Sequence, residues 1–250
     1  MTIPPKHRYL ELDLLRTAAI LLMVVYHAAF DLSAFFDVPL DPLSDGWFIL
    51  QRVTANLFLL LVGMSFAVSY GRMEARGASR KEIYGKYGRR GLSVILCGML
   101  VTLVTFVALG DMYVRFGVLH LIGVGIILLP FLMPLREWNV LTAAIAWRLG
   151  SWITDTAASA EGCDWCLIPF GMTPPEFVSV DYYPIFPWLA TILIGTAVGN
   201  LLYNRGWLRW HLPDHRLTRI VTEPGRHALV IYLVHQPVLL LALWLIAGRG

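Results

Sequence analysis

The chain has 250 residues, of which 57% are hydrophobic and only 15% are charged, and its mean hydropathy is +0.64. This composition excludes an ordinary soluble domain and predicts an integral membrane protein. The formal net charge of +3 reflects faces of unequal charge, and no nucleic-acid binder is expected.

Seven apolar segments are long enough to span the ~30 Å hydrocarbon core of a bilayer as helices. They predict an all-α, polytopic helix bundle that forms a single transmembrane domain over residues 1–250. The first segment carries Asp13 and Arg16 and is long enough to remain as an anchor, so no cleavable signal peptide is expected. The fifth is the weakest because Arg148 interrupts it. The segments lie at about 11–32, 48–70, 92–110, 117–134, 139–154, 184–203 and 228–247.

The loops between these segments alternate in charge. Basic residues gather before the first segment and after the second, fourth and sixth, whereas the other loops are mainly acidic, with Arg115 as the main exception. Basic loops face the cytoplasm in most membrane proteins. The pattern therefore predicts a cytoplasmic N-terminus and a C-terminus outside.

The first segment carries a stripe of ionisable residues on one helical face, at Asp13, Arg16, His27 and Asp31. The step from Arg16 to His27 is about three helical turns, and the step from His27 to Asp31 about one more. Each charge in hydrocarbon costs at least ~2.5 kcal/mol, and such charges usually face a binding site. The stripe predicts a functional site; the alternative is that the two pairs only mark the two ends of the span.

Several polar residues from other segments fall at the outer depth of His27 and Asp31. We expect them to line one outward-opening pocket, in which His27 acts as a general base and Asp31 orients its ring. His120 either joins this catalytic group or is a hydrogen-bonded packing residue. The expected substrate-binding residues are Arg52, Asn56, Arg115 and Asp181.

A second polar group is expected at the cytoplasmic side, where arginines suit a polyphosphorylated ligand. The alternative is that these arginines only obey the positive-inside rule and contact lipid headgroups. His235, just before Gln236 and Pro237, is a further candidate lining residue at moderate depth. The expected ligand-binding set is Asp13, Arg16, Arg89, Arg90, Arg226 and His235.

Three cysteines complete the candidate residues. Cys97 lies in the third segment as a small apolar residue. Cys163 and Cys166 lie in an outer loop, where a disulfide is expected, with idle thiols or metal and redox chemistry as alternatives. Two thiols are too few for a closed zinc site, so no metal is predicted.

Five segments, in order, resemble the bacterial relatives of heparan-alpha-glucosaminide N-acetyltransferase, over about residues 8 to 240. The spacing of Arg16 and His27 also resembles a signature of the wider group of membrane acyltransferases that acetylate surface polysaccharides, whose histidine is regarded as catalytic. The segments are ELDLLRTAAILLMVVYHAAFDL, NLFLLLVGMSFA, FGVLHLIG, DYYPIFPWLATILIGTAVG and GRHALVIYLVHQP.

The resemblance implies a multi-pass enzyme of the bacterial inner membrane that takes acetyl-CoA from the cytoplasm. It would deliver the acetyl group to an amine or hydroxyl of a sugar or glycolipid on the outer side, with His27 as base or transient acyl carrier. One departure is that the loop DVPLDPLSDGW contains no histidine, whereas the animal enzyme carries its catalytic histidine in that loop. Many relatives are dimers, so a homodimer is plausible, but no sequence feature fixes the oligomeric state.

Two other functions fit the same residues. A proton-coupled transporter of small solutes would use the ionisable stripe of the first segment. A b-type membrane cytochrome would use His27 and His120 as axial haem ligands. The acceptor, the acyl chain length and the choice between N- and O-acylation leave no mark in the sequence.

Overall fold

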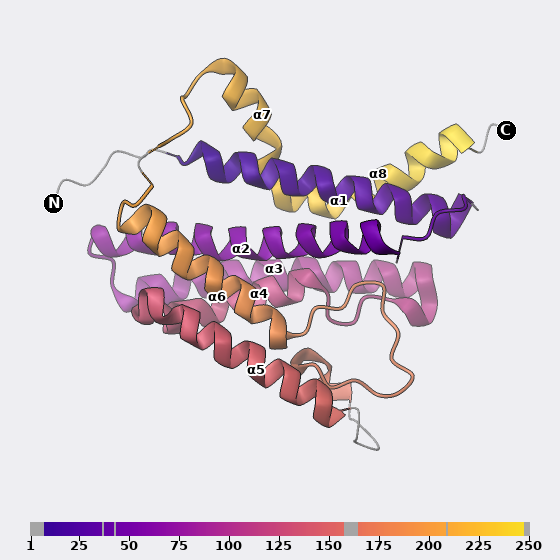
Figure 1. Ribbon diagram of the computed structural model, residues 1–250, viewed down its shortest axis with the longest axis horizontal. Coiled ribbons are helices and arrows are strands. Elements are labelled where there is room, and N and C mark those ends of the chain that lie inside the picture. Colours follow the sequence, from indigo (N-terminus) through magenta and orange to yellow (C-terminus); the bar gives the residue numbers. More distant parts are fainter. Residues whose placement is uncertain (1–7, 37, 43, 158–164, 209, 248–250) are drawn as a thin grey trace. The chain divides into compact units, whose positions relative to one another are not determined.

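A computed structural model describes residues 8–247 of the chain, apart from 37, 43, 158–164 and 209. The described residues are mostly helical and form no strand, which confirms the predicted all-α class. The α-helices are α1 (Leu10–Phe36), α2 (Asp45–Ala75), α3 (Arg80–Leu109), α4 (Val118–Leu132), α5 (Asn139–Ala157), α6 (Ile185–Gly199), α7 (Arg216–Arg226) and α8 (Ala228–Ala247) (Figure 1).

Six stretches of the described chain are long and apolar enough to cross a membrane. The fourth stretch, Val118–Thr156, contains both α4 and α5, so each of the seven predicted segments corresponds to a helix. A six-residue turn, Met133–Trp138, separates α4 from α5, and in it Arg136 adopts a left-handed φ of 49° that interrupts the helix. The chain is thus a multi-pass membrane protein, while its orientation in the membrane stays a prediction.

The basic segment 71–91 is more helical than a loop between two spans. Helix α2 continues to Ala75 and α3 begins at Arg80, so the segment extends both helices. The connecting turn contains Gly77 at a φ of 73°, and the Ser79 hydroxyl accepts a hydrogen bond from the Glu82 N–H, which caps α3.

The described chain divides into two compact units. Residues 62–208 form the first unit, in which α3 packs along α4 and α5 along α6. Residues 8–61 and 210–247 form the second unit, in which α1 packs along α7 and α8 (Figure 1). Helix α2 contributes residues 62–75 to the first unit and 45–61 to the second.

Glycines permit the closest helix contacts within each unit. A Cβ atom on Gly63 of α2 would lie 2.0 Å from the main-chain oxygen of Ile192 in α6. In the second unit, a Cβ atom on Gly225 of α7 would lie 2.0 Å from the main-chain oxygen of Asp13 in α1. Small residues that let backbones approach in this way are typical of membrane helix interfaces.

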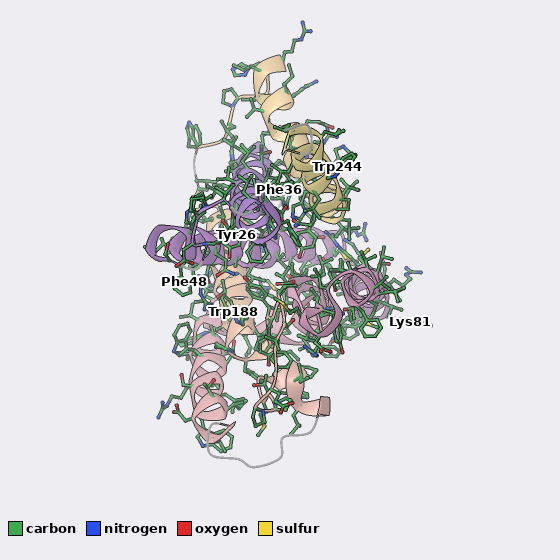
Figure 2. All side chains as sticks on the ribbon, turned by 90° about the vertical axis from the view of Figure 1, so that its right-hand side faces the viewer. Tyr26, Phe36, Phe48, Lys81, Trp188 and Trp244 are labelled. Atoms are coloured by element: carbon green, nitrogen blue, oxygen red, sulfur yellow. The ribbon has the colours of Figure 1, made fainter. Side chains whose placement is uncertain are left out.

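Large apolar side chains are exposed on the outer faces of α3 and α8. Val107 is 79% exposed, and Trp244, labelled in Figure 2, is 63% exposed. Such faces are those expected to contact lipid. Cys97 is half-buried in α3. Cys163 and the side chain of Cys166 lie outside the described residues, so their disulfide stays a prediction.

Candidate functional site

Four polar side chains of α1 and α8 come together in the second unit: His27, Asp31, His235 and Gln236. The rings of His27 and His235 meet edge to face, with 4.7 Å between their centroids and 82° between their planes. Gln236 Nε2 donates a hydrogen bond of 2.6 Å to Asp31 Oδ1. Tyr26, labelled in Figure 2, packs edge-on against His27, with 5.7 Å between the two ring centroids.

The hydrogen bonds of the two rings determine which ring nitrogen carries the proton. His27 Nδ1 lies 2.9 Å from the Met23 carbonyl oxygen, and His235 Nδ1 lies 2.6 Å from that of Tyr232. Because a carbonyl oxygen only accepts hydrogen bonds, each Nδ1 donates, and in the neutral ring Nε2 keeps its lone pair. Both imidazoles are thus held as bases that act through Nε2.

Acceptor atoms outnumber donors in this cluster. Asp31 is fully buried, and three buried atoms have no hydrogen-bond partner among the described residues: Asp31 Oδ2, His235 Nε2 and Gln236 Oε1. Leaving a buried polar atom unpaired costs about 1–3 kcal/mol. A cluster of this kind therefore suits a ligand that brings its own N–H or O–H donors, such as an amine or a hydroxyl.

The other end of α1 holds a buried ion pair. Asp13 is 1% exposed, and its Oδ1 lies 2.5 Å from Arg16 Nη1, while Arg8 bonds its other oxygen. Helix α7 covers this end, where the Gly225 N–H donates to Thr17 Oγ1 over 2.9 Å. Asp13 therefore serves as the partner of two arginines, and any contact with an anion at this end falls to the arginines.

The remaining arginines of the predicted cytoplasmic set have other surroundings. Arg226 at the end of α7 bonds Glu223 over 2.6 Å. Arg89 and Arg90 are exposed on α3, in the first unit. His235, which was placed in this set, instead packs against His27.

His120 has a different environment, at the start of α4 in the first unit. Its Nδ1 accepts a hydrogen bond of 3.2 Å from the Gly117 N–H, so the neutral ring carries its proton on Nε2. The ring also fills the space beside Gly98, where a Cβ atom would lie 3.0 Å from it. This geometry fits the packing alternative for His120, but its buried Nε2 has no hydrogen-bond partner among the described residues, so both alternatives stay predictions.

Asp181 also serves the start of α4. Its Oδ2 accepts a hydrogen bond of 3.1 Å from the Val118 N–H. Burial raises the pKa of this carboxyl to about 6, and the Val118 bond partly opposes the rise. Asp181 lies outside the spans and is a titratable group in the range of ordinary working pH.

Arg115, Arg52 and Asn56 each contact residues of their own unit. The Arg115 guanidinium lies 4.3 Å from the ring centre of Tyr113 and bonds the main-chain oxygen of Val178. Arg52 lies over the Phe48 ring, and Asn56 Nδ2 donates to the Arg52 carbonyl oxygen, both on the part of α2 in the second unit. Arg115 and Asp181 thus belong to one unit, and Arg52 and Asn56 to the other.

Comparison with known protein families assigns the chain to one family. The family model for the catalytic domain of heparan-alpha-glucosaminide N-acetyltransferase matches residues 8–237. The chain belongs to this family. No curated protein and no solved structure matches the chain. Membership indicates a membrane acetyltransferase, and the matched range includes His27, Asp31, His235 and Gln236.

Gln236 is the member of the cluster to which the sequence analysis assigned no role. The only sequence signal for it was an amide side chain between a histidine and a proline inside an apolar span. The pairing of α1 with α8, more than 200 residues apart along the chain, turns this amide into the partner of Asp31.

Proposed function

We propose that the protein transfers an acetyl group from cytoplasmic acetyl-CoA to an amine or hydroxyl of a sugar or glycolipid at the outer side of the membrane. His27 is the proposed general base or transient acyl carrier. The observation that carries the proposal is the arrangement of His27 and His235, with both Nδ1 atoms bound to carbonyls and both Nε2 atoms left as bases. Family membership supports the acetyl group.

In the direct route, the acceptor attacks the thioester carbonyl while His27 Nε2 removes its proton. The carbon–sulfur bond breaks, and the coenzyme A thiolate leaves and takes the proton from the imidazolium. Asp31 Oδ2 and Gln236 Oε1 accept hydrogen bonds from the amine or hydroxyls of the acceptor, which supplies the donors that this cluster lacks.

In the acyl-carrier route, His27 Nε2 attacks the thioester and the thiolate leaves, so that the acetyl group is bound to nitrogen. His27 then has no free ring nitrogen with which to deprotonate the acceptor, because Nδ1 is bound to the Met23 carbonyl. In the second step the acceptor attacks the acetyl carbonyl, the bond from this carbon to His27 Nε2 breaks, and another base takes the proton of the acceptor. His235 meets this need, since its ring lies 4.7 Å from that of His27.

The purified protein, incubated with labelled acetyl-CoA and a panel of amino sugars and glycolipids, is expected to transfer label. His27→Ala should lower kcat by about 100- to 10,000-fold, the usual contribution of a general base. His211→Ala is the matched control, because His211 is exposed and contacts Glu11 and Tyr9 near the start of α1. Undiminished transfer in His27→Ala contradicts the proposed role.

The same preparation separates the rival functions. A Soret band in the visible spectrum of the purified protein would indicate the cytochrome. Solute uptake into proteoliposomes that stops when the proton gradient is collapsed, without acetyl transfer, would indicate the transporter.

A further inference from the structure

An open pocket lies at one end of the first unit, and none of its lining residues belongs to the candidate site of α1 and α8. The ends of α2 and α4, the start of α3 and the turn Met133–Trp138 enclose about 630 Å³. Ligand pockets typically measure about 300–1,000 Å³. The residues that give the pocket its chemistry are Tyr70, Glu74, Arg80, Tyr84, Phe131 and Arg136.

One wall of the pocket is aromatic. The rings of Tyr84 and Phe131 are nearly parallel, with 4.8 Å between centroids and 13° between planes. Phe131 is 60% exposed, so this stacked pair leaves ring surface open. A stacked aromatic platform of this kind binds the planar face of a nucleobase.

Two arginines, Arg80 and Arg136, give the pocket its positive charge. Arg136 is held at its left-handed φ of 49° by the fully buried Asn139, whose Nδ2 donates 3.0 Å to the Arg136 carbonyl oxygen. Strained backbone of this kind is concentrated at functional sites. The Arg136 guanidinium reaches Glu74 only at 3.5 Å, the outer limit of a hydrogen bond, so the guanidinium has little to lose when an anion binds it.

We propose that this pocket binds a nucleoside phosphate, with the base on Phe131 and the phosphates at Arg80 and Arg136. The inference rests on the proposed function for the identity of its ligand, since the adenosine phosphate end of acetyl-CoA is the nucleoside phosphate that the reaction supplies. The pocket lies at the end of α2 and the start of α3, which the charge pattern predicts to be cytoplasmic.

Binding of adenosine 3′,5′-bisphosphate to the full-length protein in detergent, measured by titration calorimetry, tests the proposal without any transfer reaction. Arg136→Gln is expected to raise Kd about tenfold or more, because it removes a charged hydrogen bond. Phe131→Ala is expected to raise Kd about fivefold or more, because it removes a stacking surface.

Two matched controls accompany these variants. Lys81→Gln removes a positive charge from an exposed side chain next to Arg80 but outside the pocket lining, and Lys81 is labelled in Figure 2. Leu128→Ala truncates an exposed residue of α4 about one turn before Phe131. Both should change Kd less than twofold. Thermal melting identifies any variant that fails to fold. If a pocket variant fails to fold, Arg80→Gln takes its place, because Arg80 also lines the pocket and is proposed to bind the phosphates.

The outcomes test nucleotide binding in this pocket separately from acetyl transfer by the protein. Nucleotide binding that depends on Arg136 and Phe131, without acetyl transfer to any acceptor, supports the pocket and contradicts the proposed function. Acetyl transfer with an unchanged KM for acetyl-CoA in both variants supports the function and overturns the pocket. Absence of saturable nucleotide binding to the wild type, or binding of phosphatidylglycerol vesicles alone that depends on Arg136, also overturns the pocket.

Discussion

The imidazole rings of His27 and His235 form an edge-to-face pair in which each ring is tied through Nδ1 to the backbone of its own helix. Neither ring can rotate without losing that hydrogen bond, so both Nε2 atoms have fixed directions. The pair thus brings one possible base from α1 and one from α8 into direct contact. It also makes the two residues interdependent.

If the pair acts as a unit, the effects of its two substitutions are not additive. His27→Ala and His235→Ala are each expected to lower kcat by about 100- to 10,000-fold, the range for loss of a general base. The double variant should be little worse than the more damaged single one, because residues that act together lose their function once. Label transfer rates of the three variants check this, and multiplied losses would show that the two rings act independently.

The Asp31–Gln236 hydrogen bond allows stability to be separated from activity. Gln236→Leu alone removes the hydrogen bond to the buried Asp31 carboxyl and should destabilise the protein by about 1–3 kcal/mol. The double variant Asp31→Leu with Gln236→Leu replaces both partners by apolar groups, which is nearly neutral or stabilising. Thermal melting should therefore recover in the double variant while acetyl transfer stays low.

The opposite result has a clear meaning. Recovery of transfer in the double variant would show that neither Asp31 nor Gln236 contacts the acceptor. Ser33→Ala is a suitable control. The Ser33 hydroxyl donates a hydrogen bond to the carbonyl oxygen of Leu40, which follows the end of α1, and Ser33 is not a member of the cluster.

The close approach of α7 to α1 depends on Gly225. A Cβ atom there would lie 2.0 Å from the Asp13 carbonyl oxygen, so Gly225→Ala must push the two backbones apart. It should lower stability by about 1–3 kcal/mol, the usual cost of overpacking. Gly88→Ala in α3 is the control, because nothing lies within 4 Å of its Cβ position.

The control should be neutral or stabilising by up to about 1 kcal/mol, since alanine favours a helix more than glycine does. Equal melting temperatures for Gly225→Ala and Gly88→Ala would mean that α7 does not pack on α1 in this way. A lower melting temperature for Gly225→Ala alone supports the contact.

The fold could be predicted from the sequence because a bilayer leaves few choices. Each apolar run of sufficient length must be a helix that satisfies its own backbone, and each of the seven predicted runs corresponds to a helix. Helix ends were less predictable. The predicted segments ended at 70 and resumed at 92, yet the backbone between them continues α2 and α3, since charged residues near a span are also good helix formers.

The site could be predicted only along a single helix. Helical periodicity on α1 puts Asp13, Arg16, His27 and Asp31 on one stripe. The partners of His27 and Asp31 come from α8, and which residues of two helices meet depends on packing that no local pattern encodes. For this reason His235 was expected to accompany the phosphate-binding arginines, and Gln236 had no assigned role.

Asp181 gives the protein a pH-dependent stability that can be measured. Its pKa is raised by burial from 3.8 to about 6, so the native state binds more protons than the unfolded state between these values. This carboxyl therefore lowers stability as pH rises from about 4 to 6, by at most about 3 kcal/mol for a shift of about two pH units. Asp181→Asn stays neutral and keeps an oxygen to accept the Val118 hydrogen bond.

The melting temperature of the wild type should fall progressively relative to that of Asp181→Asn as the pH rises from about 4 to 6.5, with no further divergence above that. Taking the difference between the two proteins cancels the titration of every other group. Asp111→Asn is the control, because Asp111 is exposed. A constant difference between wild type and Asp181→Asn across this range would mean that the Asp181 carboxyl titrates at its ordinary value, and that its bond to the start of α4 carries a full charge.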